Sequence, residues 1–207
     1  MAPHFTLEGV IGEAPNTPAD LRQFLNANSA SAVTLSINSP GGDAYAGAAM
    51  MAAVEGHGGV TVHVRGIAAS AATLPVVAAQ KVVIHHAALL MIHEPAALAD
   101  GPADTHRMAA DALDKMSGVY AAAYAKHTGH SVDRILAWMR AETWMTAEEA
   151  VELRFADQIE ALTAPMMLAA FDYTRFRSAP VALVQATHKN GWAAGSPDSK
   201  SKGKQDA

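Results

Sequence analysis

The chain has 207 residues, of which 50% are hydrophobic and only 6% are aromatic, so small aliphatic side chains must fill most of its core. This length suits one domain with a substantial core and an additional tail. The formal net charge of −5 argues against a nucleic-acid partner, and the absence of cysteine excludes disulfides, thiolate metal sites and cysteine nucleophiles.

Short β-branched segments alternate with longer helical patterns along most of the chain, which is typical of an α/β fold around a mostly parallel sheet. The predicted strands cover residues 4–11, 32–38, 59–65, 81–86 and 88–93. Thr17 and Pro18 mark the start of a helix that ends near residue 28, and "SPGG" precedes a second helix over residues 43–55.

A third helix is expected near Ser70, where Pro75 should cause a kink or a late helix start because an interior proline removes a hydrogen bond. Further along, we predict helices over residues 103–129 and 131–140, a short strand over residues 142–145 and a last short helix. The alternation then fades, and the end of the chain is rich in Gly, Ser and Lys. These features predict one domain over residues 1–160 and a C-terminal extension over residues 161–207 that is largely flexible.

The N-terminal stretch "MAPHFTLEGV" has neither the basic start nor the apolar run of a secretory signal. The longest uncharged stretch near Ser70, residues 66–80, is too short and too rich in small residues to span a bilayer. We therefore expect a soluble cytoplasmic protein without a membrane partner.

Ser70 follows a strand and opens a helical segment, where free backbone N–H groups favour an anion, and the alanines around it leave room for a substrate. An ordinary helix-capping serine would give the same pattern, so both interpretations remain open. A serine nucleophile needs a base, and His93 lies at the carboxyl end of an apolar strand, where α/β proteins build their sites. His85 and His86 are the reserve candidates, and their pairing is a weak indication of a metal site because no supporting ligand follows at a suitable spacing.

The base in turn needs an acid that orients it. Glu142 precedes a short strand and a capped helix, so its position should be rigid, and Asp157 and Glu94 are the alternatives. The segment "INSPGG" could supply backbone N–H groups to an oxyanion, because adjacent glycines let the backbone approach a ligand closely. A plain strand-to-helix turn is the alternative interpretation of this segment.

Together and in this order, "INSPGG", "GIAASAA", "MIHEP" and "ETWMTAEEAVE" resemble the Clp protease proteolytic subunit family over residues 5–160. The resemblance is closest to the phage and prophage branch, whose members are head maturation proteases. It implies that Ser70 is the nucleophile and His93 the general base. It also places Glu142 where well-known members carry an aspartate, and assigns the oxyanion hole to the backbone N–H groups of Gly42 and Ala71.

The resemblance implies an α/β fold, a crotonase-like spiral of β-β-α units with a protruding handle, for which residues 95–116 would supply a strand and a helix. It also implies a homo-oligomeric ring, or stacked rings, that encloses the active sites, needs no cofactor or metal and cleaves proteins or peptides such as capsid or scaffold proteins. An ATP-driven unfoldase is the expected partner of a housekeeping member, which is one alternative. The others are an acyl-CoA enzyme of the crotonase type and an inactive structural protein. A Ser/Lys dyad is disfavoured, because Lys81 is too close in sequence to Ser70 and Lys115 falls within the long predicted helix.

Overall fold

The computed structural model describes residues 2–160 and 168–193, and within these ranges seven strands form one sheet. Its main path runs β1-β2-β3-β4-β7 with every pair parallel, while β5 pairs with β3 and the antiparallel strand β6 pairs with β5. The strands are β1 (His4–Glu8), β2 (Val33–Ser39), β3 (Val60–Ala69), β4 (Lys81–His85), β5 (Leu89–Ile92), β6 (Thr143–Met145) and β7 (Gln158–Glu160). The predicted α/β fold with a mostly parallel sheet is confirmed.

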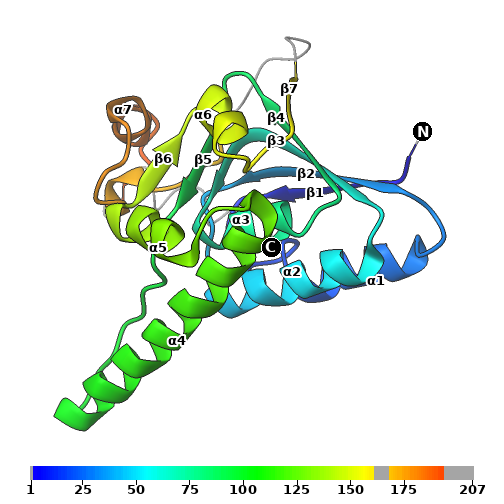
Figure 1. Cartoon of the computed structure of the whole chain (residues 1–207). Coiled ribbons are helices and arrows are strands. Elements are labelled where there is room, and N and C mark those ends of the chain that lie inside the picture. The colour runs from blue at the N-terminus through cyan, green and yellow to red at the C-terminus, as the bar shows by residue number, and fades with distance from the viewer. Residues whose placement is uncertain (1, 161–167, 194–207) are drawn as a thin grey trace, which may run out of the picture.

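Helices α1, α2 and α3 cover one face of this sheet, and the long helix α4 projects away from the body (Figure 1). The helices are α1 (Pro18–Ala27), α2 (Ala44–His57), α3 (Thr73–Val77), α4 (Ala103–Thr128), α5 (Val132–Ala141), α6 (Ala147–Glu152) and α7 (Val181–Lys189). Two short 3₁₀ turns are η1 (Ser70–Ala72) and η2 (Tyr173–Arg175). Because α3 begins only at Thr73, Pro75 falls in its first turn, where no hydrogen bond is lost, and the late helix start is confirmed.

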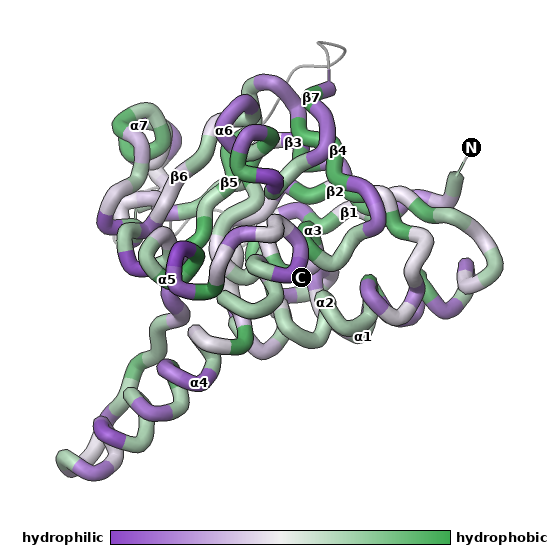
Figure 2. The backbone as a smooth tube through the Cα atoms, in the orientation of Figure 1, coloured by the Kyte–Doolittle hydropathy of each residue, from purple (hydrophilic) through white to green (hydrophobic). Residues whose placement is uncertain are grey.

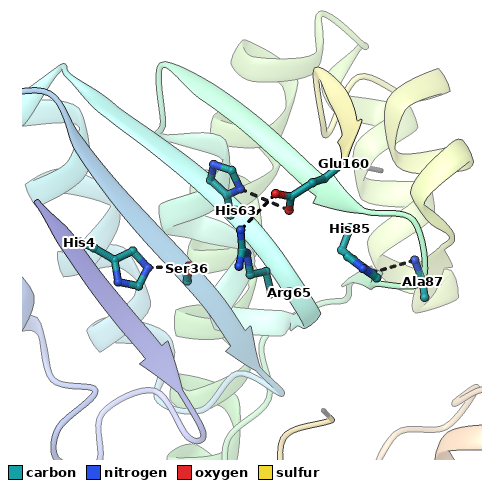
Figure 3. A network of polar contacts seen from close by, with 7 residues as sticks. All are labelled: His4, Ser36, His63, Arg65, His85, Ala87 and Glu160. Atoms are coloured by element: carbon teal, nitrogen blue, oxygen red, sulfur yellow. Dashed lines mark hydrogen bonds and ion pairs between the residues drawn. The ribbon is translucent and has the colours of Figure 1, made fainter. Parts of the chain in front are cut away.

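Apolar and polar residues alternate along the first strands, so that one sheet face forms the core with the helices. Val33, Leu35 and Ile37 of β2 are buried in that core, and Figure 2 shows hydrophobic residues following the central strands. The opposite face of β1, β2 and the first half of β3 is polar (Figure 3). There the His4 ring is hydrogen-bonded to the Ser36 hydroxyl, while Glu160 of β7 accepts a hydrogen bond from Arg65 at 3.1 Å.

Gly66 bends β3 and lets it change partners halfway along its length. Residues 61–64 pair with β4, whereas residues 67–69 pair with β5, and the register between β2 and β3 shifts at the same place. Gly66 has a φ of 138°, a conformation that side chains rarely adopt, so glycine suits this bulge. The second half of β3 is therefore directed toward β5 and the residues that follow it.

Residues 168–193 form a packed segment that covers the second face of β3 and β5. Tyr173 and Leu183 are buried against Ile67 and Met91, and α7 lies beside β6 in Figure 1. The prediction of a flexible extension is therefore wrong for residues 168–193. The aromatic side chains of "FDYTRF" cover strands whose residues are apolar on both faces of the sheet. The remaining parts of that expectation, residues 161–167 and 194–207, lie outside the described residues.

The projecting part of the chain contains a helix but not the predicted strand. Residues 94–100 have no regular structure, and α4 begins at Ala103. A strand needs a neighbour for its backbone groups, and none of the described strands pairs with this segment. Leu98 and Met108 are exposed here. In the described part of the chain, no helix has both the length and the apolar character needed to cross a membrane.

Candidate active site

Three neighbouring strands bring Ser70, His93 and Glu142 to one place. Ser70 directly follows β3 and His93 directly follows β5, and in these parallel strands Ala69, the last residue of β3, pairs with Met91, the last residue but one of β5. Glu142 directly precedes the antiparallel strand β6, in which Thr143 pairs with Ile92 of β5. Continuing this register by one residue puts Glu142 opposite His93, so strand pairing alone assembles the three residues.

Ser70 and His93 are joined by a hydrogen bond of 2.7 Å between the serine Oγ and the imidazole Nε2. Ser70 has a φ of 54°, which is strained for a residue other than glycine. Its carbonyl oxygen accepts a 2.6 Å hydrogen bond from Thr73 Oγ1, and that hydroxyl lies 2.6 Å from the buried Tyr124 hydroxyl. These contacts hold the backbone of Ser70 in its unusual conformation.

The "SPGG" turn lies directly against the serine. A Cβ added to Gly41 would lie 2.7 Å from the Ser70 Cβ and 3.2 Å from the Ala71 nitrogen, so no side chain fits between the two segments. Gly42 and Ala71 line the same pocket as Ser70 and His93. Ala71 is the second residue of a 3₁₀ turn, where a backbone N–H has no acceptor within the turn. Two residues from different segments, each of which carries a backbone N–H, thus line one pocket.

Glu142 is buried, but its carboxylate is bound by the C-terminal segment rather than by His93. Its Oε2 accepts a 3.1 Å hydrogen bond from the backbone N–H of Arg177. Its Oε1 accepts bonds from the Ser178 N–H at 2.6 Å, the Ser178 hydroxyl at 2.9 Å and Trp144 Nε1 at 3.4 Å. Among the described residues, the hydrogen bonds of this carboxylate include none to His93. The expected contact between acid and base is therefore electrostatic here.

A pocket of about 720 Å³ opens beside Ser70 and His93, which is large enough for several residues of an extended peptide. Its walls come from the segment after His93, the side of α4 and the C-terminal segment, which contributes Phe171, Arg175 and Phe176. The Phe176 ring also packs edge-on against the His93 ring, with 5.8 Å between the ring centroids. The C-terminal segment is thus part of the site.

The other candidates from the sequence do not line the pocket beside Ser70 and His93. Glu94 pairs with Arg140 at 3.3 Å, and Asp157 accepts a hydrogen bond from the Val82 N–H at 2.7 Å. The remaining candidates, which do not line the pocket, are His85, His86, Lys81 and Lys115. Within residues 2–160 and 168–193, no group of three or more His, Cys, Asp or Glu side chains is arranged to hold a metal ion.

Several residues around the site have no signal in the local sequence. Thr73 and Tyr124 support the Ser70 backbone, and residues 176–178 contact His93 and Glu142. One indication is composition: "FDYTRFR" is aromatic and basic, unlike a flexible tail. A segment of this kind is better suited to packing than to solvent.

The two titratable partners of Ser70 have shifted pKa values for different reasons. Burial lowers the pKa of His93, the negative charges of Glu142 and Glu94 partly oppose this effect, and the positive charge of Arg177 adds to it. For Glu142, burial acts to raise the pKa, but hydrogen bonds from Ser178, Arg177 and Trp144 outweigh it and leave the pKa below its ordinary value. At neutral pH the site therefore holds a neutral imidazole next to an ionised carboxylate.

His93 is expected to titrate below the ordinary histidine value of 6.5, and its neighbours should shift this pKa in opposite directions. Glu142→Gln removes a negative charge and should lower the pKa further, whereas Arg177→Gln removes a positive charge and should raise it. NMR titration of the imidazole measures both shifts. Two shifts of the same sign would contradict this account of the charges.

The same shift makes the stability of the fold depend on pH. Because the folded-state pKa of His93 is depressed, the unfolded chain binds the proton more readily than the folded chain. The stability contributed by a neutral His93 is therefore present above the unfolded pKa of 6.5 and is lost as the pH falls toward the lower folded-state pKa.

Comparisons of the sequence with known proteins point to the Clp protease family, and the comparison of the fold is consistent with it. The model of the Clp protease family matches residues 17–162. An ATP-dependent Clp protease proteolytic subunit from Bacteroides fragilis is 32% identical over 131 residues, or 61% of this chain and 63% of that relative, which the chain thus spans only in part. Proteolytic subunit 2 from Rhodococcus jostii is 31% identical over 131 residues, or 61% of this chain and 67% of the relative. A ClpP1 mutant from Listeria monocytogenes has the same fold, with a TM-score of 0.68 at 24% identity over 76% of this chain and 90% of that one.

Proposed function

Because the chain belongs to the Clp protease family, we propose that it is a serine endopeptidase with Ser70 as nucleophile, His93 as general base and Glu142 as the acid. The observation that carries this proposal is the 2.7 Å hydrogen bond between Ser70 Oγ and His93 Nε2 at the edge of the pocket. A serine hydroxyl becomes nucleophilic when a base within this distance can take its proton. Burial supports the role of His93, because it keeps the imidazole neutral and able to accept.

The proposed reaction begins when Ser70 Oγ attacks the carbonyl carbon of a peptide bond and its proton passes to His93 Nε2. The negative charge that develops on the carbonyl oxygen is stabilised by the backbone N–H groups of Gly42 and Ala71. His93 then protonates the leaving amine, and an acyl-enzyme remains on Ser70. Water, deprotonated by the same imidazole, hydrolyses this ester, while the charge of Glu142 stabilises the imidazolium in both steps.

We further propose that the protein assembles into a homo-oligomeric ring, or stacked rings, through the projecting part of the chain. The exposed apolar side chains of Leu98 and Met108 support this, because apolar groups on a projecting element are suited to contact with a second copy. Residues 94–100 also lack a strand partner within the described part of the chain, and another copy could supply one.

Within the family, we propose the head maturation branch of phages and prophages, with capsid or scaffold proteins as substrates. The packed extension beyond the family match supports this proposal, because residues 168–193 add a wall to the pocket. The alternative is a housekeeping subunit that works with an ATP-driven unfoldase, and the names of the relatives favour it.

Labelling by a fluorophosphonate probe, applied after separation by size, tests both the chemistry and the assembly. The probe should form a bond to Ser70 Oγ in a fraction much larger than a monomer, and peptide mapping by mass spectrometry should locate it on Ser70. The Ser70→Ala variant is the matched control and should elute at the same size without label.

The possible results separate the competing functions. An acyl-CoA enzyme of the crotonase type or an inactive structural protein would remain unlabelled, and that result would refute the proposed peptidase. Label confined to a monomeric fraction would leave the chemistry intact but refute the ring.

A further inference from the structure

Three consecutive residues of the C-terminal segment connect the base and the acid of the site. We propose that this strip, Phe176–Ser178, positions the carboxylate of Glu142 beside His93, and that Ser178 is a positioning residue for the reaction. The inference rests on the proposed peptidase function and adds a fourth residue to it. It also gives the C-terminal segment a role that the family match over residues 17–162 does not include.

The strip supplies most of the hydrogen bonds of the Glu142 carboxylate. One oxygen accepts from the Arg177 N–H and the other from the Ser178 N–H and hydroxyl. The Ser178 hydroxyl also lies 2.8 Å from the main-chain oxygen of Glu142, so its single proton serves either the backbone or the side chain of the same residue. Charge-assisted bonds of this kind fix a carboxylate more firmly than neutral ones.

Glu142 needs an external support because its own backbone gives little. It has a φ of 54° at the end of α5, a left-handed conformation that is unfavourable for a residue other than glycine. Without a bond to His93, the carboxylate would be free to turn toward solvent. The hydrogen bonds from Arg177 and Ser178 prevent this and keep the negative charge close enough to raise the pKa of His93.

The strip is itself firmly anchored on both sides. Phe176 packs on the rings of Trp144 and Phe171, with centroids 5.4 and 5.6 Å away. The Arg177 guanidinium donates a 2.6 Å hydrogen bond to the main-chain oxygen of Arg140 on α5. Because the strip contacts β6 and α5 as well as His93, its position relative to both catalytic partners is defined.

The charged groups around His93 come from three parts of the chain, and each of them shifts the pKa of His93. Glu142 lies at the end of α5 and Arg177 in the strip, while Glu94 follows β5 and pairs with Arg140. Ser178 carries no charge, so replacing it changes the position of the Glu142 carboxylate without changing the number of charges.

The variant Ser178→Ala tests the proposal by removing the hydroxyl while leaving both backbone N–H groups. In the full chain, kcat for a fluorogenic peptide should fall about tenfold, a size typical of residues that orient a catalytic group. KM should stay within about a factor of two, because Ser178 does not line the pocket. By NMR, His93 should titrate at a lower pH than in the wild type, since the carboxylate is held less firmly beside it.

Two further variants separate positioning from a general effect on folding. Ser178→Thr keeps the hydroxyl and should restore both kcat and the His93 titration. Val181→Ala shortens an exposed side chain at the start of α7 and should match the wild type. The proposal would be overturned if Ser178→Ala left both kcat and the His93 titration unchanged. It would also be overturned if Ser178→Ala raised kcat, because the strip would then hold the acid away from the base. The NMR titration needs no activity, so it tests the strip even if the peptidase proposal fails by labelling.

Discussion

Ser70→Ala and His93→Ala should each lower kcat for peptide hydrolysis by about 10⁴-fold or more, and the double variant should lose no more than either single one. The two residues act as one unit, because the hydroxyl reacts only when the imidazole accepts its proton across the 2.7 Å hydrogen bond. Once either partner is missing, removing the other costs nothing further. Steady-state kinetics on a fluorogenic peptide with the three variants provides the measurement.

Two controls make this result specific to the site. His188→Ala removes an exposed histidine of α7 and should leave kcat unchanged. Ser70→Gly should be as inactive as Ser70→Ala but more stable by about 1 kcal/mol, because glycine adopts a φ of 54° without strain. Losses in the two single variants that add up in the double variant would show that Ser70 and His93 contribute independently, against the proposed mechanism.

Gly42→Ala is expected to disrupt both the fold around the site and its activity. A Cβ at this position would lie 2.2 Å from the Ile11 oxygen and 2.8 Å from the Ile11 nitrogen, and these backbone atoms cannot rotate away. The φ of 151° adds strain for any side chain. We expect a loss of about 2 kcal/mol or more in the free energy of unfolding, measured with urea, together with loss of hydrolysis.

Gly56→Ala is the matched control for this substitution. Gly56 lies in α2, and an added Cβ there meets nothing within 4 Å. Alanine should therefore be neutral or stabilise the protein by up to about 1 kcal/mol through its better helix propensity. If Gly42→Ala were as stable as Gly56→Ala, the turn would have room to relax, and its N–H would not be held in place by the contact with Ile11.

The sequence was sufficient to predict six of the seven described strands, all except β7, and to place Ser70 and His93 at or just after the carboxyl ends of strands. Ser70 and His93 follow β3 and β5, and in a parallel sheet the carboxyl ends of neighbouring strands meet at one edge. What the sequence did not show is that β3 and β5 are neighbours at all. That pairing depends on the bend at Gly66, where β3 leaves β4. A single glycine in a strand also occurs where another backbone approaches closely, so it does not by itself predict a change of partner.

The partners of Glu142 could not be predicted for a different reason. Arg177 and Ser178 lie 35 and 36 residues further along the chain, in a segment that was predicted to belong to the flexible extension. A clue was present in β5, because "LLMI" is apolar at every position and such a strand must be covered on both faces. The helices cover one face, so a second layer had to exist, and residues 168–193 provide it. The strand predicted in the handle is absent from the described residues, because a strand forms only where a second strand can pair with its backbone groups.

The segment that covers β5 has a practical consequence for anyone who shortens this protein. A chain cut where the family match ends, at residue 162, looks like a complete unit by homology. It would nevertheless expose Ile67 and Met91, which are fully buried in the whole chain, and would leave an exposed apolar patch beside the pocket. Such a truncation would be prone to aggregate. Fusion partners and purification tags are better attached beyond Trp192. The boundary of the engineered protein is then set by the packed residues and not by the end of the family match.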